Sequence, residues 1–215
     1  MKQTLTLFLQ ILSLTVSCSS PTDNRKNINE TGDSLIPKIV YIKNKDSLQM
    51  NQLIKEYDLN SIDTFVVGDV NGDGKEDKAI IQPLVFFYQN NKIDSQFVNI
   101  TFTCKIPSIK HYNGFQGLIS NVGDLDGNKT NEFVYYPYWY QSNSAGIYVY
   151  GYIQNRWILF GSGSIRRDII DGQKDPIKFL KSRINKVDNN SFKLTQHVWT
   201  EEGKFVDSTT RIIIK

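Results

Sequence analysis

The sequence predicts an all-β fold that is mostly antiparallel and has one or two short helices. After Asn60 the chain is rich in aromatic and β-branched residues, and short apolar runs are separated by Asn-Asn, Asp-Gly and Glu-Gly turns. This arrangement favours antiparallel meanders over parallel units. Two acidic loops, within residues 65–83 and 118–136, also repeat with an offset of 55 residues, the step from Asp69 to Asp124. The period indicates a repeated supersecondary unit.

Residues 1–17 have the features of a secretory signal. Lys2 precedes an apolar run from Leu5 to Val16, and this run is shorter than the ~20 residues that a membrane-spanning helix needs. The sequence Thr15-Val16-Ser17-Cys18 resembles the lipobox of bacterial lipoprotein precursors, although that family prefers leucine where Thr15 stands. The resemblance implies that Cys18 is lipidated and holds the protein on a membrane. A plain secreted protein that is cut nearby is the alternative.

The two cysteines limit the covalent options. If Cys18 carries lipid, Cys104 is the only remaining thiol, so an internal disulfide is impossible. Cys104 lies in an alternating, strand-like run and is interpreted as a buried, unreactive thiol. Residues 18–36 are polar and are expected to be a flexible tether. Residues 37–215 are expected to form a single β-rich domain.

The elements are expected in the following order. Pro37 precedes a first strand in residues 38–43. Asp46 and Gln49 have capping-box spacing and begin a helix whose apolar stripe ends at Tyr57. A short helix is expected around Pro176–Leu180. The other strand candidates are Thr64–Val67, Lys78–Gln82, Val85–Gln89, Gln96–Lys105, Leu118–Asn121, Glu132–Tyr140, Gly146–Ile153, Arg156–Gly161, Ser182–Val187, Phe192–Thr200 and Lys204–Ile214.

The acidic loops carry oxygen-bearing side chains at matching positions. Positions one, three, five and nine are Asp69, Asn71, Asp73 and Asp77 in the first loop, and Asp124, Asp126, Asn128 and Glu132 in the second. A hard cation such as calcium collects ligands at alternate residues of a tight loop. Three carboxylates so close together also repel one another. The spacing therefore predicts two calcium sites, and two acidic turns without metal are the alternative.

The combination of a strand, Gly-Asp, an Asp/Asn-rich loop and another strand resembles the FG-GAP and VCBS-like repeats of integrin-type β-propellers. The resemblance covers about 20 residues in each loop region. It implies structural calcium ions whose ligands include the main-chain carbonyls of Lys75 and Thr130. An EF-hand would need a glutamate at position twelve, where Ile80 and Tyr135 stand.

The length limits the architecture that this resemblance implies. Residues 37–215 provide about three units of this period, whereas closed propellers have four to eight blades. We therefore expect a propeller-like or sandwich-like meander with two related calcium-loop blades. In the second loop, Asn128-Lys129 replaces the Asp73-Gly74 of the first. Because glycine gives a tight turn more backbone freedom, the second site is expected to be the weaker one.

For the function, the sequence favours a binding or structural lipoprotein. An extracytoplasmic hydrolase or carbohydrate-active protein is the alternative. His111 and His197 are the only histidines and are interpreted as structural or solvated. In Val134–Gln141, alternation places Tyr136, Tyr138 and Tyr140 on one face, which is a candidate ligand surface. Pro137 cannot donate a ladder hydrogen bond, which predicts an edge strand.

Charge and the amino terminus narrow the location and the partners. The formal net charge is +3 and the basic residues are scattered, so nucleic acid is not expected as a partner. An envelope protein or a glycan is the expected partner. Ser19 and Ser20 follow Cys18 without an early acidic cluster. The expected location is therefore the bacterial cell envelope, on the outer membrane and facing the periplasm if the cell has two membranes.

Overall fold

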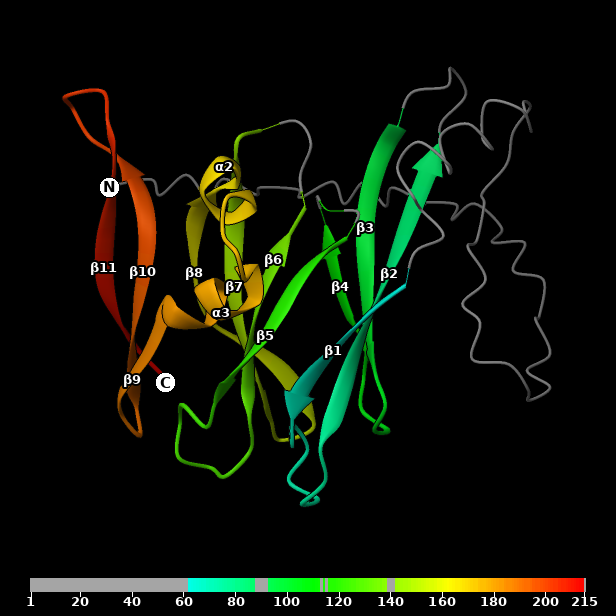
Figure 1. Ribbon diagram of the computed structural model, residues 1–215. Coiled ribbons are helices and arrows are strands. Elements are labelled where there is room, and N and C mark those ends of the chain that lie inside the picture. The colour runs from blue at the N-terminus through cyan, green and yellow to red at the C-terminus, as the bar shows by residue number, and fades with distance from the viewer. Residues whose placement is uncertain (1–61, 88–92, 113, 115, 139–141, 215) are drawn as a thin grey trace, which may run out of the picture. The chain divides into compact units, whose positions relative to one another are not determined.

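The computed structural model describes residues 62–87, 93–112, 114, 116–138 and 142–214. The predictions for residues 1–36 (including Cys18), for the strand in 38–43, for the helix in 46–57 and for Tyr140 lie outside the described residues. The described part is mostly antiparallel β, with three antiparallel sheets and two short helices (Figure 1). This confirms the predicted fold class. In this part, no helix has the length and apolar character that crossing a membrane requires.

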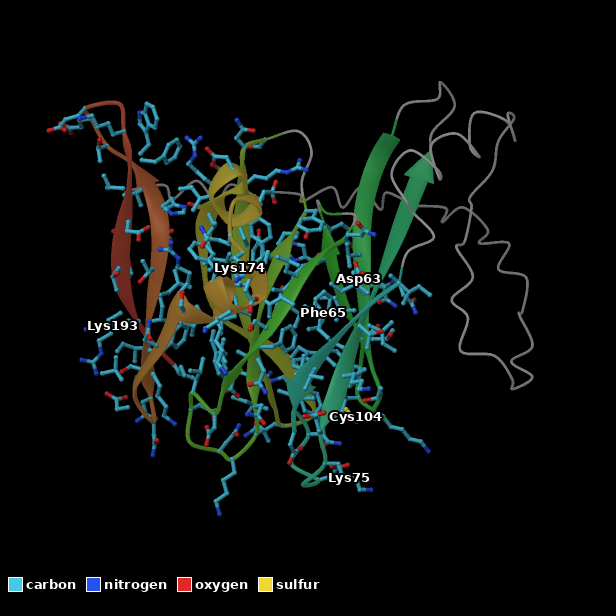
Figure 2. All side chains as sticks on the ribbon, in the orientation of Figure 1. Asp63, Phe65, Lys75, Cys104, Lys174 and Lys193 are labelled. Atoms are coloured by element: carbon cyan, nitrogen blue, oxygen red, sulfur yellow. The ribbon has the colours of Figure 1, made fainter. Side chains whose placement is uncertain are left out.

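Two of the sheets are four-stranded meanders in which each strand pairs with the next along the chain. The first contains β1 (Asp63–Gly68), β2 (Asp77–Phe87), β3 (Ile93–Phe102) and β4 (Ile109–Tyr112). The second contains β5 (Gly117–Gly123), β6 (Glu132–Pro137), β7 (Ser144–Ile153) and β8 (Arg156–Arg166). In each sheet an acidic loop joins the first strand to the second, and Lys75 of the first loop is labelled in Figure 2.

The two meanders are repeats in structure as well as in sequence. Pairing of β1 with β2 shifts register between Val66 and Gly68, and pairing of β5 with β6 shifts between Asn121 and Gly123. Gly68 and Gly123 have φ angles of 76° and 80°, a left-handed conformation that favours glycine at a bulge. The same bulge therefore precedes both acidic loops.

A third, three-stranded sheet follows two short helices. It has the order β11-β10-β9, with β9 at Ile184–Asp188, β10 at Ser191–Trp199 and β11 at Phe205–Ile213. Helix α2 is Arg167–Asp171 and helix α3 is Pro176–Ser182. The Asp175 side chain accepts a hydrogen bond from the Lys178 N–H and caps α3, with Pro176 in the first turn. The helix predicted near Pro176 is confirmed, whereas α2 was not predicted.

Two details of the first sheet differ from the sequence prediction. The expected strands Lys78–Gln82 and Val85–Gln89 are one strand, β2, which passes through Pro83. Pairing of β1 with β2 ends at Ile81, while Pro83 pairs with Val98 of β3. The missing N–H of Pro83 therefore interrupts no hydrogen bond between β1 and β2. The short strand β4 was not predicted, because its four residues carry little periodic signal.

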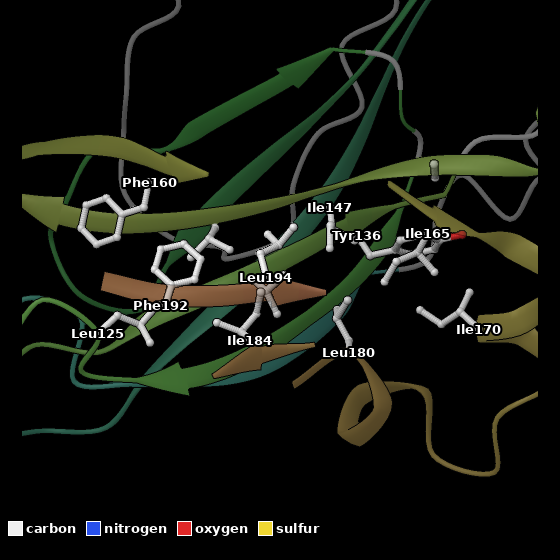
Figure 3. Close-up of a cluster of buried hydrophobic side chains, with 13 residues drawn as sticks. Leu125, Tyr136, Ile147, Phe160, Ile165, Ile170, Leu180, Ile184, Phe192 and Leu194 are labelled. Carbon is white, nitrogen blue, oxygen red and sulfur yellow. The ribbon is translucent and has the colours of Figure 1, made fainter. Parts of the chain in front are cut away.

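The buried apolar residues form two clusters with the second sheet in common. One cluster packs the second sheet against the third sheet and the helices (Figure 3). The other packs the second sheet against the first. Strand β6 contributes Val134 and Tyr136 to the former cluster, and Phe133 and Tyr135 to the latter. Both faces of β6 are therefore buried, as are all six of its residues.

This burial corrects two predictions about the aromatic strand. Strand β6 is not an edge strand, because it pairs with β5 on one side and with β7 on the other. Pro137 is tolerated because it is the last residue of β6, beyond the pairing with β7 that ends at Tyr135. Tyr136 is 1% exposed and cannot belong to an exposed tyrosine row. Tyr138 follows the strand and meets the Tyr136 ring edge-on at 6.1 Å.

Candidate metal centre

In the first loop, the carboxylate at position one organises the main chain. The Asp69 carboxylate accepts hydrogen bonds from the N–H groups of Gly72, Asp73 and Gly74 at 2.7 to 3.1 Å. The amide oxygen of Asn71 accepts from the Asp73 N–H. The Asp73 carboxylate in turn accepts from the Lys75 N–H at 2.9 Å. These bonds hold the tight turn but also use oxygens that the sequence assigned to an ion.

The second loop repeats this arrangement. The two oxygens of the Asp124 carboxylate accept hydrogen bonds from the N–H groups of Gly127 and Lys129. Asp126 accepts from the main-chain and side-chain N–H groups of Asn128. The amide oxygen of Asn128 accepts from both the N–H and the hydroxyl of Thr130 at 2.6 Å. The loops therefore share their local conformation.

The loops differ in whether their carboxylates converge. Ligand atoms of Asp124, Asp126 and Glu132 all lie within 4.8 Å of one another, and this cluster could hold a metal ion. It is the only such group of three or more His, Cys, Asp or Glu side chains among the described residues. The three aspartates of the first loop, which are all described, do not form an equivalent group. The structure thus brings together the predicted acidic ligands of the second loop and not those of the first.

Glu132 is the unusual member of the cluster. Its side chain is fully buried, its Oε2 accepts a hydrogen bond from the Leu125 N–H, and its Oε1 has no hydrogen-bond partner among the described residues. Burial raises the pKa of Glu132 to about 8, and the nearby charges of Asp126 and Asp124 add to this rise against the opposing Leu125 hydrogen bond. Burial also raises the pKa of Asp126. A cation at this position would supply the missing partner.

The residue at position nine explains why the carboxylates of the first loop do not converge as those of the second loop do. Asp77 accepts a hydrogen bond from the Val70 N–H at 3.2 Å, as Glu132 does from Leu125. Aspartate is one methylene shorter than glutamate, so from the same anchor its second oxygen reaches less far. The Cys104 thiol also lies beside Asp77, and burial together with this carboxylate raises the thiol pKa to about 12. Cys104 lies beyond the end of β3 and is half-buried, not fully buried as predicted. Its raised pKa still makes it, as predicted, poorly suited to form a reactive thiolate.

Three residues that sequence reasoning missed connect the loops to neighbouring sheets. Asn131 of the second loop donates its N–H to the Asp69 carbonyl at 2.7 Å and accepts from the Asp69 N–H at 2.9 Å. Lys186 of β9 donates to the Asp124 carbonyl at 2.6 Å. Asn189 lies so close to Gly127 that an added Cβ would approach its side chain to 2.6 Å. Nothing in the sequence pairs Lys186 with Asp124.

Both histidines are buried and engaged in packing or hydrogen bonds. The His111 ring contacts the rings of Tyr135 and Tyr148, and burial lowers its pKa to about 4. His197 accepts a hydrogen bond from the Arg166 N–H through Nδ1, and its Nε2 lies 3.0 Å from Asp207. These environments support the interpretation of both residues as structural.

Comparisons of the chain with protein-family models, curated proteins and solved structures found no match.

Replacement of Lys129 by glycine should stabilise the second loop. Lys129 has a φ angle of 74°, at the position where the first loop has Gly74 with φ 80°. A residue with a Cβ is strained in this region by roughly 1 kcal/mol relative to glycine. We expect Lys129→Gly to raise the free energy of unfolding by about that amount in urea titrations with chelator present. Lys129→Ala removes the same charge but keeps the Cβ, so an equal gain in that control would contradict backbone strain as the cause.

Without metal, Glu132 should make stability depend on pH. Its pKa is about 8 in the folded chain and takes the ordinary value of 4.5 when unfolded. The stabilisation from its proton is therefore complete below pH 4.5 and is lost as the pH rises through 8. In chelator, we expect the free energy of unfolding of the wild type to fall between about pH 5 and pH 8 relative to Glu132→Gln. Parallel pH profiles for the two proteins would show that Glu132 titrates normally.

Proposed function

We propose that this chain is a calcium-stabilised β module that serves as a binding or structural protein of the bacterial cell envelope. The observation that carries the proposal is the buried, unpaired Oε1 of Glu132, which belongs to a cluster of three carboxylates. A buried carboxylate needs a proton or a cation. A divalent cation would neutralise most of this cluster and satisfy the free oxygen.

The chemistry of the cluster favours calcium. Its ligand atoms are carboxylate oxygens that lie within 4.8 Å of one another, and calcium takes such oxygens in a flexible geometry with bonds of about 2.3 to 2.6 Å. Magnesium requires bonds of about 2.0 to 2.1 Å in strict octahedral geometry. The carbonyl of Thr130 would add a neutral oxygen, as the resemblance to FG-GAP and VCBS-like loops implies. The side-chain oxygen of Asn128 is already used by Thr130.

We propose the first loop as a secondary calcium site. It has the same register of Asp69, Asn71, Asp73 and Asp77 and would offer the Lys75 carbonyl. Its acidic side chains would have to move towards one another before they could share an ion. The order of affinities that we propose is therefore the reverse of the order expected from the glycine content of the loops.

A structural role for the metal accords with its position. The cluster includes Glu132, the first residue of β6 in the second sheet. Close to it, Asn131 connects the second loop to the first, and Lys186 connects the second loop to the third sheet. The carbohydrate-active alternative loses support, because Tyr136 is buried and cannot stack on a sugar. An envelope protein or a glycan remains the proposed partner, bound elsewhere on the module.

The proposed location depends on the amino terminus. The apolar run of Leu5–Val16 and the lipobox-like Thr15-Val16-Ser17-Cys18 support export and lipidation of Cys18. We propose that the lipid holds the module on the outer membrane facing the periplasm, or on the outside of the single membrane of a cell that has only one.

Calcium should raise the melting temperature of the full chain in detergent, mainly through the second loop. Binding to the folded state alone adds about 2.7 kcal/mol at a hundredfold excess over Kd, which corresponds to several degrees for a domain of this size. We expect Glu132→Gln to remove most of the shift between chelator and excess calcium. Differential scanning calorimetry would measure it.

Asp73→Ala is the matched control, since it removes a carboxylate from the first loop. It should retain most of the calcium-dependent shift. A shift that is lost in Asp73→Ala and kept in Glu132→Gln would assign the main site to the first loop. Identical wild-type curves with calcium and with chelator would mean that both loops are acidic turns without metal.

The tether is tested by Cys18→Ser. Without an acceptor for lipid, the chain should move from the membrane fraction of the expressing cells to the soluble fraction. Immunoblots of the two fractions, and metabolic labelling with a fatty acid, would measure the change. Membrane retention of the variant at the wild-type level would refute lipid attachment through Cys18.

A further inference from the structure

The second loop has a positive charge beside its carboxylates that comes from a distant part of the chain. Lys186 lies on β9, and its Nζ donates a hydrogen bond to the Asp124 carbonyl at 2.6 Å. The same Nζ is 3.8 Å from Oδ1 of Asp124. The ammonium group therefore lies next to the oxygens that would surround an ion.

The first loop makes the corresponding contact with a neutral group. There, the carbonyl of Asp69 accepts its hydrogen bond from the main-chain N–H of Asn131. In both loops, a residue of the following sheet or loop thus binds the carbonyl at position one. Because a neutral donor suffices in the first loop, the charge of Lys186 is not required merely to hold the loop.

We propose that Lys186 sets the affinity of the second loop for metal and matches the site to divalent ions. This inference rests on the proposed metal site. Three ionised carboxylates, one ammonium group and one divalent cation sum to zero charge. A trivalent ion would leave an excess positive charge in a cluster whose member Glu132 is fully buried, and such an excess is unfavourable.

The effect of the Lys186 charge on ion affinity depends on the distance between Nζ and the ion. An ion about 2.4 Å from Oδ1 of Asp124, which is 3.8 Å from Nζ, would lie at most about 6 Å from Nζ. Even with the dielectric constant of water, removal of a unit charge at about 6 Å strengthens the binding of a divalent ion roughly tenfold. Repulsion grows in proportion to the charge of the ion, so a trivalent ion should gain roughly thirtyfold.

The test compares Ca²⁺ and Tb³⁺ binding by the full chain in detergent. Terbium luminescence and competition with calcium would give both dissociation constants for the wild type, Lys186→Met, Lys186→Arg and Lys193→Met. We expect Lys186→Met to bind calcium about tenfold and terbium about thirtyfold more tightly. Lys186→Arg keeps the charge and should stay within about threefold of the wild type. Lys193→Met is the surface control, with the same loss of charge on β10 (Figure 2), and should not change either constant.

The outcomes separate this inference from the proposed function. If Lys186→Met weakens both ions equally, Lys186 acts only by holding the loop, and the electrostatic role is wrong. If the variant binds both ions as the wild type does, the role is wrong as well, while the metal site stands. If the wild type binds neither ion and Glu132→Gln behaves identically, the metal site is wrong and the role of Lys186 is wrong with it. Melting curves in chelator would confirm that each variant is folded.

Discussion

The fold places a carboxylate where water cannot reach it, and the rest of the site depends on this constraint. Glu132 begins β6, the strand whose two faces pack against two different core clusters. Its burial follows from the central position of that strand. A buried carboxylate keeps its proton, as the raised pKa of Glu132 shows, or receives a cation. Asp124 and Asp126 make the binding of a cation feasible, because they bring two more carboxylate groups close to Glu132.

The loops also lie at the junctions between successive sheets. Asp69 in the first loop is bound by Asn131 in the second, and Asp124 in the second is bound by Lys186 in the third sheet. Each contact uses the main chain at position one of a loop. An ion held by the second loop would therefore stabilise more than its own turn, since the same residues hold the main chain that the adjacent sheets contact. A metal bound there would therefore have a structural role, in a chain that has a single thiol among its described residues.

The sequence was sufficient for those features that arise locally. The period of the two loops and the antiparallel meanders follow from spacing and turn chemistry, and the structure has both. The position of β6 could not be predicted, because alternation along one strand does not reveal that both of its faces are covered. Tyr136 was misassigned to the surface for this reason. Lys186 was missed because its contact with Asp124 joins residues that are 62 positions apart.

The order of affinities that we propose for the two loops weighs a local effect against a long-range one. Gly74 and Lys129 occupy the same left-handed position, and the glycine of the first loop is favoured there by roughly 1 kcal/mol. This local advantage predicted the stronger site in the first loop. A buried, ionised carboxylate without a partner costs several kcal/mol, and at Glu132 that cost is relieved by a proton or by an ion that binds beside it. In the proposed order, the burial of Glu132 outweighs the backbone preference, so the strain at Lys129 would reduce the advantage of the second loop without reversing it.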